Sequence, residues 1–89
     1  MSRVEVRVAP LLHAYTRGAS VVPATGATLG EVLDDLDRQF GGIRFRLVDE
    51  QDRLRPHMRC FVNGADTRDV ALPLSDGDEV FIVGALSGG

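Results

Sequence analysis

The chain has 89 residues, with ten basic and thirteen acidic side chains, so its formal charge at neutral pH is −3. A hydrophobic content of 44% excludes a disordered chain, and this length predicts one compact domain with a modest core. The single cysteine excludes an internal disulfide and a cysteine-rich zinc site, and the acidic balance argues against a nucleic-acid partner.

The first part of the chain predicts two strands. Over residues 3–9, Val4, Val6 and Val8 alternate with charged residues, which is the pattern of a strand with one buried face. Pro10 ends this strand, and the segment up to residue 18 predicts a loop. A second strand follows around residues 19–24. Because the proline at position 23 lacks a backbone donor, we expect this strand at an edge of the sheet.

A helix is predicted from residue 29 onward. Thr28 and Glu31 form a capping box, in which a hydroxyl and a carboxylate accept hydrogen bonds from free backbone amides. The acidic residues of this segment predict a solvated face, and residues 41–42 (GG) predict a left-handed ending. Apolar side chains recur at helical spacing and make one stripe: Leu29, Val32, Leu33, Leu36 and Phe40.

The remaining elements are shorter. Residues 44–57 are irregular and charged, and alternating patterns predict strands over residues 57–62 and 79–83, with a short strand near residues 67–68. Asn63-Gly64 predicts a hairpin turn, and residues 75–78 (SDGD) predict a second turn. Residues 84–89 (GALSGG) predict a flexible tail after a domain of residues 1–83. This order predicts an α+β fold, in which one sheet carries one helix on one face.

No local pattern predicts an active site. His13 and His57 lack further ligands at metal-binding spacing, so we expect no metal site. Cys60 falls at an inward position of an apolar strand, where a thiol packs as a small hydrophobe. No apolar run approaches the roughly 20 residues of a membrane span, and no leader is evident, so we expect a cytoplasmic protein with no membrane partner.

The tail offers a different chemistry. Gly88-Gly89 has no Cβ atoms, so it can enter a narrow channel and adopt backbone angles closed to other residues. Six extended residues reach roughly 20 Å, enough to deliver a carboxylate into a partner's buried site. An ionised carboxylate is a poor electrophile, so it needs activation, and ATP can supply this by forming an acyl-adenylate.

Several motifs resemble those of the small sulfur-carrier proteins. These are residues 28–36 (TLGEVLDDL), 61–64 (FVNG), 74–80 (LSDGDEV) and 88–89 (GG). The family includes the molybdopterin synthase small subunit, the thiamine-pathway carrier, and carriers for cysteine or thiosugar biosynthesis. The resemblance implies a ubiquitin-like β-grasp fold, with a mixed sheet of four to five strands, one main helix on one face and a flexible C-terminal tail.

Other segments point to one branch of the family. Residues 10–12 (PLL), 16–18 (TRG), 47–49 (LVD) and 54–55 (LR) resemble the cysteine-type carriers more than the molybdopterin subunit. Residues 84–87 (GALS) depart from several relatives, which have a proline shortly before the two glycines. This departure disfavours a molybdopterin assignment and leaves the carrier chemistry unchanged.

The resemblance implies that the protein is not an enzyme and binds no cofactor of its own. A ubiquitin-activating-like adenylyltransferase would use ATP and magnesium to adenylate Gly89. A sulfide source or a sulfurtransferase would then convert the adenylate to a thiocarboxylate, and a sulfur-accepting synthase would take the sulfur. The residues implied to enter the partner's active site are Gly88, Ser87, Leu86, Ala85 and Gly84.

Strand alternation also predicts a docking surface. If Val80 and Ile82 point inward, then Phe81 and Val83 point outward, because side chains alternate along a strand. Phe61 points outward for the same reason. In the implied topology the two phenylalanine-bearing strands are adjacent, so their rings would share the uncovered face. The alternative is that these are single exposed apolar residues, which are common on soluble proteins. The predicted surface consists of Phe61, Phe81 and Val83, framed by Arg7 and Arg59.

Two other classes of function start from the same residues. A ubiquitin-like protein modifier would share the fold and the adenylate, but would be joined through Gly89 to lysines of target proteins. A non-covalent binding module would have no use for the tail, so an added residue after Gly89 would change nothing. The predicted order is carrier first, modifier second and passive module last.

Overall fold

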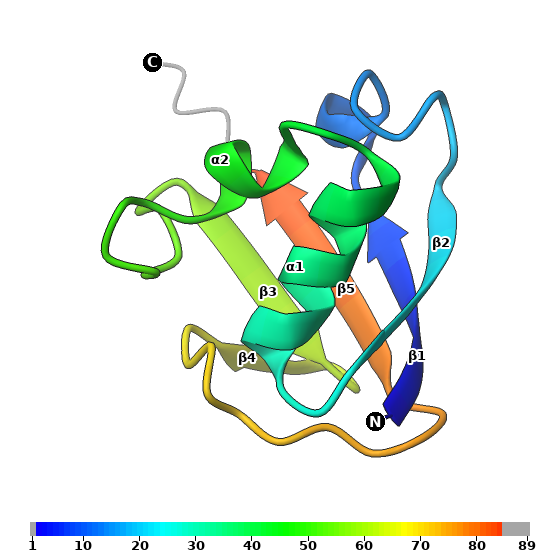
Figure 1. The fold of residues 1–89 in the computed structure, drawn as a ribbon, viewed down its shortest axis with the longest axis vertical. Coiled ribbons are helices and arrows are strands. Elements are labelled where there is room, and N and C mark those ends of the chain that lie inside the picture. Colours follow the sequence, from blue (N-terminus) through cyan, green and yellow to red (C-terminus); the bar gives the residue numbers. More distant parts are fainter. Residues whose placement is uncertain (1, 85–89) are drawn as a thin grey trace.

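The computed structural model describes residues 2–84, and its element order matches the predicted one apart from two short helices. One main helix lies across a single five-stranded sheet (Figure 1). The elements are β1 (Ser2–Val8), the 3-10 helix η1 (Pro10–Leu12), β2 (Val21–Gly26), α1 (Leu29–Gln39), α2 (Ile43–Leu47), β3 (Met58–Val62), β4 (Ala65–Thr67) and β5 (Glu79–Gly84).

The sheet has the strand order β2-β1-β5-β3-β4, and β1 and β5 are parallel while the other three pairs are antiparallel. This mixed sheet with one crossing helix confirms the predicted β-grasp fold. Pro23 lies on the edge strand β2, opposite Glu5, as its missing donor requires. The second strand begins two residues later than predicted, at Val21.

Helix α1 begins with the predicted capping interaction. The Thr28 hydroxyl accepts a hydrogen bond from the Glu31 amide at 3.2 Å. The Glu31 carboxylate accepts from the amide of Ala27 at 3.0 Å, one residue earlier than in the standard capping box. Gly42 takes the left-handed conformation after the helix, with φ of 97°. Within residues 2–84, no helix is both long and apolar enough to cross a membrane.

The core fills the space between α1 and one face of the sheet. The apolar stripe of α1 meets inward side chains of β1, β3 and β5, and burial of each large aliphatic side chain contributes about 1.5–3 kcal/mol. The most completely buried of these side chains are Val6, Leu29, Val32, Leu33, Leu36, Ile43, Leu47, Cys60, Val80 and Ile82.

The segment after α1 differs from its prediction as irregular. Residues 43–47 form the short helix α2, with Ile43 and Leu47 fully buried and Phe45 and Arg46 exposed. Five residues give only one i,i+4 apolar pair, and the intervening arginines hide it. The following residues return to β3 through a bridge between Val48 and residue 54.

Strand β5 is one residue longer than predicted. Gly84, expected at the start of the tail, pairs with Met58 as the last residue of β5. A Cβ atom at this position would lie 2.6 Å from Leu11 Cδ2, which shows how closely the Leu11 side chain of η1 approaches the end of β5. Residues 85–89, which make up the rest of the predicted tail, lie outside the described residues.

Both predicted turns are confirmed. Asn63 and Gly64 have φ values of 51° and 86°, the positive angles that a tight hairpin between β3 and β4 requires. Gly77, with φ of 87°, supplies the left-handed residue of the second turn, where the Asp78 amide donates to the Ser75 carbonyl at 3.1 Å.

Candidate functional site

The uncovered face of the sheet brings the predicted docking residues together. In the strand register, Phe61 on β3 lies opposite Phe81 on β5, and Phe81 lies opposite Arg7 on β1. Arg59 and Val83 form the next row along the same two strands. The five side chains that alternation assigned to this surface therefore occupy two adjacent rows, and we call them the open-face cluster.

The two phenylalanine rings are in contact across the strand pair. Their centroids lie 6.3 Å apart and their planes are tilted by 35°. Aromatic pairs of this kind contribute about 0.5–1.5 kcal/mol beyond their buried area. Both rings are half-buried, and together with Arg7, Gly64 and Glu79 they line a depression of about 300 Å³. The face thus offers a preformed apolar seat.

Charges of both signs surround this seat. Arg7 forms an ion pair with Glu79 at 3.4 Å, and Arg59 forms one with Asp66 at 3.4 Å. All four side chains are about half exposed, so each pair contributes at most about 1 kcal/mol and can exchange partners. The arginines were predicted to frame the surface, and the structure adds that each has an acidic neighbour within ion-pair distance.

The end of β5 relates this face to the predicted reactive residues. Gly84 is the last described residue, and it lies one row beyond Val83 and opposite Met58. The expected sulfur-bearing residue, Gly89, and the residues 85–88 lie outside the described part of the chain. Their roles stay predictions.

The surroundings of Cys60 and the two histidines, from which no chemistry was expected, are defined by the structure. Cys60 is fully buried, and this burial raises the pKa of its thiol to about 12, which suppresses the reactive thiolate. His13 is half-buried, with its Nε2 atom 3.1 Å from the Val8 carbonyl oxygen, and His57 is exposed. No group of metal-binding side chains gathers anywhere in residues 2–84.

Sequence reasoning missed the role of Arg68. Its guanidinium donates to the carbonyl oxygens of Met58, Leu54 and Arg55 at 2.7–2.8 Å. It thereby connects the residue after β4 to the segment that leads into β3. A single arginine after a short strand gives no signal of this function, because its acceptors lie 10–14 residues away.

Comparison with known proteins identifies the family. Residues 9–89 match the ThiS family. The chain belongs to the ThiS family. It is 36% identical to the sulfur carrier protein CysO of Mycobacterium tuberculosis, in an alignment that covers 97% of this chain and 98% of that protein. The predicted family and its cysteine-type branch are thus confirmed.

Solved structures agree with this assignment. A chain in the crystal structure of the Amycolatopsis orientalis BexX/CysO complex superposes on this ThiS-family chain with a TM-score of 0.90 and 35% identity, covering 97% of this chain and 99% of that one. The crystal structure of Mycobacterium tuberculosis CysO gives a TM-score of 0.87 with 35% identity, over 93% and 99% of the two chains. The small archaeal modifier protein 3 of Haloferax volcanii is 33% identical over 71% of each chain.

Proposed function

We propose that this ThiS-family protein is a sulfur carrier whose Gly89 bears the sulfur as a thiocarboxylate. The observation that carries the proposal is the end-to-end similarity to CysO sulfur carriers, which spans 97% of the chain. The family match extends through Gly88 to Gly89, the residue that would react.

The proposed cycle has three steps, and other proteins carry them out on Gly89. An adenylyltransferase uses ATP and magnesium to attach AMP to the Gly89 carboxylate, and pyrophosphate leaves. Sulfide attacks the acyl carbon and displaces AMP, which gives the thiocarboxylate. Where the persulfide of a sulfurtransferase attacks instead, a thiol must reduce the resulting acyl disulfide to release the thiocarboxylate. At a sulfur-accepting synthase the thiocarboxylate sulfur bonds to the substrate, and water then cleaves the acyl bond to Gly89, which restores its carboxylate. The carrier is a reagent rather than a catalyst in this cycle, which we place in the cytoplasm.

In this proposal the open-face cluster is the surface that the partner enzymes bind. Phe61 and Phe81 supply a fixed apolar contact, and Val83 extends it toward the end of β5. Arg7 and Arg59 would exchange their intramolecular carboxylates for acidic groups on the partner. The five remaining residues after Gly84 would span up to about 17 Å when extended, so a partner bound at this face could receive Gly89.

High-resolution mass spectrometry tests the proposal. The protein is incubated with an adenylyltransferase, ATP, magnesium and sulfide, and the intact mass and C-terminal peptide are measured. We expect exchange of one oxygen for sulfur on Gly89. Oxidation of Met1 or Met58 gives nearly the same mass gain, so the change must be assigned to the peptide that contains Gly89. An unmodified Gly89 beside a carrier that the same enzyme does convert would contradict the proposal.

A second candidate is a protein modifier, favoured by the similarity to small archaeal modifier protein 3. The modifier would form an isopeptide bond between Gly89 and lysines of other proteins. All ten basic residues of this chain are arginine, so it offers no lysine side chain on which polymeric chains could grow. Conjugates in cell lysate that vanish when Gly89 is deleted, with no thiocarboxylate detected, would favour this candidate.

A further inference from the structure

A second surface lies at the end of the molecule where β5 finishes, and it combines basic and aromatic side chains. It is formed by the loop after η1, the end of α1, α2 and the segment before β3 (Figure 1). Its guanidinium groups stack on rings at 5.0–5.7 Å from the ring centroids, and we call it the arginine–aromatic surface: Arg17 over Phe40, Arg46 over Tyr15 and Arg55 over Phe45.

These three arginines differ in their partners from the five arginines that form ion pairs. Among residues 2–84, Arg17, Arg46 and Arg55 form no ion pair with a carboxylate. The arginines that do form one are Arg7, Arg38, Arg44, Arg53 and Arg59. The stacked guanidinium groups therefore keep their positive charge unneutralised by a direct carboxylate contact.

The stacking leaves part of each guanidinium ready for another acceptor. The Nε of Arg46 donates to the Tyr15 hydroxyl, and the Nε of Arg55 donates to the Phe45 carbonyl at 2.8 Å. A guanidinium has five N–H donors in one plane, so the terminal nitrogens of both side chains still have donors free for a carboxylate. Because the rings already order these side chains, little conformational entropy is lost when they bind.

The local charge also favours an acidic partner. Residues 9–18 and 40–57 carry five basic and three acidic side chains, although the whole chain has a formal charge of −3. Arg44 is neutralised by Asp34 and Asp52, and Arg53 is paired with Asp49. The stacked arginines are therefore the ones in these two segments without a carboxylate in direct contact.

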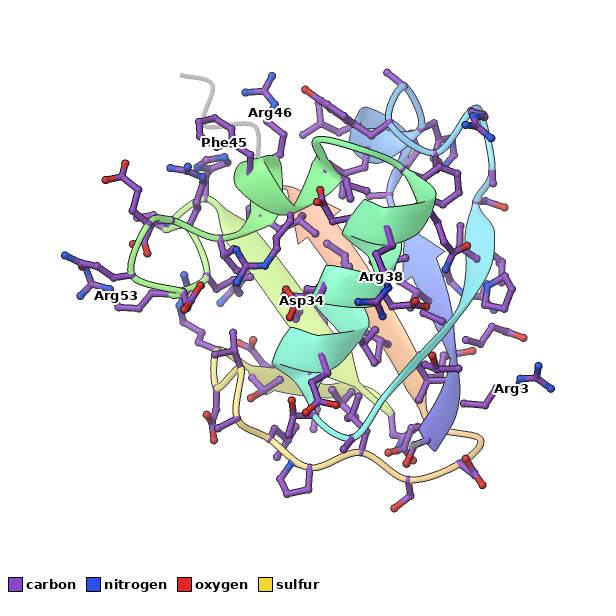
Figure 2. All side chains as sticks on the ribbon, in the orientation of Figure 1. Arg3, Asp34, Arg38, Phe45, Arg46 and Arg53 are labelled. Carbon is purple, nitrogen blue, oxygen red and sulfur yellow. The ribbon has the colours of Figure 1, made fainter. Side chains whose placement is uncertain are left out.

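The position of the surface connects it to the proposed reaction. Leu11 of η1 contacts the end of β5 at Gly84, and Tyr15 follows η1 in the chain. Phe45, with 69% of its surface exposed, provides an apolar contact beside Arg55. Figure 2 shows Phe45 and Arg46 together on α2, whereas Arg38 projects from α1 and Arg53 from the loop between α2 and β3. A protein that receives the residues after Gly84 would meet this surface.

We propose that the arginine–aromatic surface binds an acidic face of the partner protein that receives Gly89, as a contact additional to the open-face cluster. This rests on the proposed function. The open-face cluster would supply apolar contact, while the arginine–aromatic surface would steer the partner and orient the end of β5.

Kinetics with a matched pair of variants test the proposal. Arg17→Gln/Arg46→Gln removes two stacked charges, and Arg38→Gln/Arg53→Gln removes two charges that are already paired. With an adenylyltransferase that activates the parent chain, we expect kcat/KM to fall about tenfold at low salt for the first variant and less than about twofold for the second. Equal effects, or a loss that salt does not reduce, would overturn the proposal. Urea denaturation of both variants checks that they are folded.

A titration separates this surface from the proposed function. The nitrogen-15 labelled parent chain is titrated with an oligoglutamate peptide, and the arginine Nε–H signals are followed by NMR. We expect the signals of Arg17, Arg46 and Arg55 to shift more than those of Arg38 and Arg53. Uniform shifts, equal shifts with inorganic phosphate, or tighter binding of a short RNA would overturn it. Failure of sulfur transfer to Gly89 would instead contradict the proposed function and leave this titration valid.

Discussion

The two faces of the sheet are built by the same strands and differ in burial and in charge. Toward α1, Cys60, Val80 and Ile82 are fully buried in an apolar layer. On the open side, Phe61 and Phe81 are half-buried and stand among exposed ion pairs. Adjacent residues of one strand, such as Cys60 and Phe61, thus belong to different environments.

This difference shows that alternate residues of one strand make unequal contributions to stability, and the proposed function assigns the less buried set to recognition. Burial contributes free energy in proportion to the apolar area removed from water, so the covered face dominates folding. Substitutions on the open face should lower the free energy of unfolding less, and in the proposed function this face contacts the partner enzymes. A substitution on the covered face should therefore change mainly the free energy of unfolding, whereas one on the open face should change mainly the rate of reaction with partner enzymes.

The largest expected contrast is in the reactivity of Cys60. Burial raises the pKa of this thiol to about 12. A rise of about three units lowers the thiolate fraction about a thousandfold near neutral pH. We expect iodoacetamide at pH 8 to alkylate the native protein at least about a hundredfold more slowly than the urea-unfolded chain. The chain has one cysteine, so the unfolded protein is its own control, and equal rates would show that the covered face opens readily.

The next largest effect is on folding. Leu33 is fully buried on the inner side of α1. Leu33→Ala should lower the free energy of unfolding by about 3 kcal/mol, because apolar burial is lost and a cavity is left behind. Arg38→Ala on the exposed side of the same helix should cost less than about 0.5 kcal/mol. Urea denaturation measures both, and a similar loss for the two variants would contradict the division between faces.

A third effect belongs to the open face. Phe61→Asp with Phe81→Asp should slow adenylation of Gly89 about thirtyfold while the chain stays folded, because the apolar seat is lost. The control is Ala71→Asp, which adds a carboxylate at an exposed loop position outside the open-face cluster and should change the rate less than about twofold. Unchanged kinetics for the double variant would exclude the open-face cluster as the docking surface.

Local patterns predicted the features that depend on neighbouring residues. The capping box at Thr28, the hairpin at Asn63 and the edge position of Pro23 each follow from one residue's backbone or hydrogen-bonding preference. The pairing of Phe61 with Phe81 required the fold as well, since strand alternation gives the face but only the topology makes β3 and β5 neighbours.

What the sequence did not predict depends on contacts between distant segments. Arg68 finds three carbonyl acceptors only after the segment before β3 has folded against β4. The stacking of Arg46 on Tyr15 joins residues 31 positions apart, and nothing in either local pattern distinguishes these arginines from ion-paired ones. Such features became visible only when α2 and the loop after η1 were placed together.

The smallest expected effect lies at the rim between the two faces, on the free edge of β2. The amide of Thr25 donates to the Asp35 carboxylate at 3.0 Å, and Gln39 donates to the Pro23 carbonyl at 2.9 Å. Helix α1 thereby occupies edge groups that would otherwise be open to pairing with another strand. Burial by itself would raise the pKa of Asp35, but the hydrogen bonds from Thr25, Arg38 and Gln39 outweigh it and lower this pKa.

Because the folded-state pKa of Asp35 is depressed, its carboxylate stabilises the fold above the unfolded-state pKa of about 3.9, and this contribution is lost as pH falls through the folded value. Asp35→Asn keeps an acceptor oxygen and removes the charge, so we expect it to cost about 0.5–1 kcal/mol at pH 7. Urea denaturation at pH 7 and below pH 4 should show the difference between parent and variant shrinking in acid. A difference that stays constant with pH would mean that the oxygen's position, rather than its charge, holds the edge of β2.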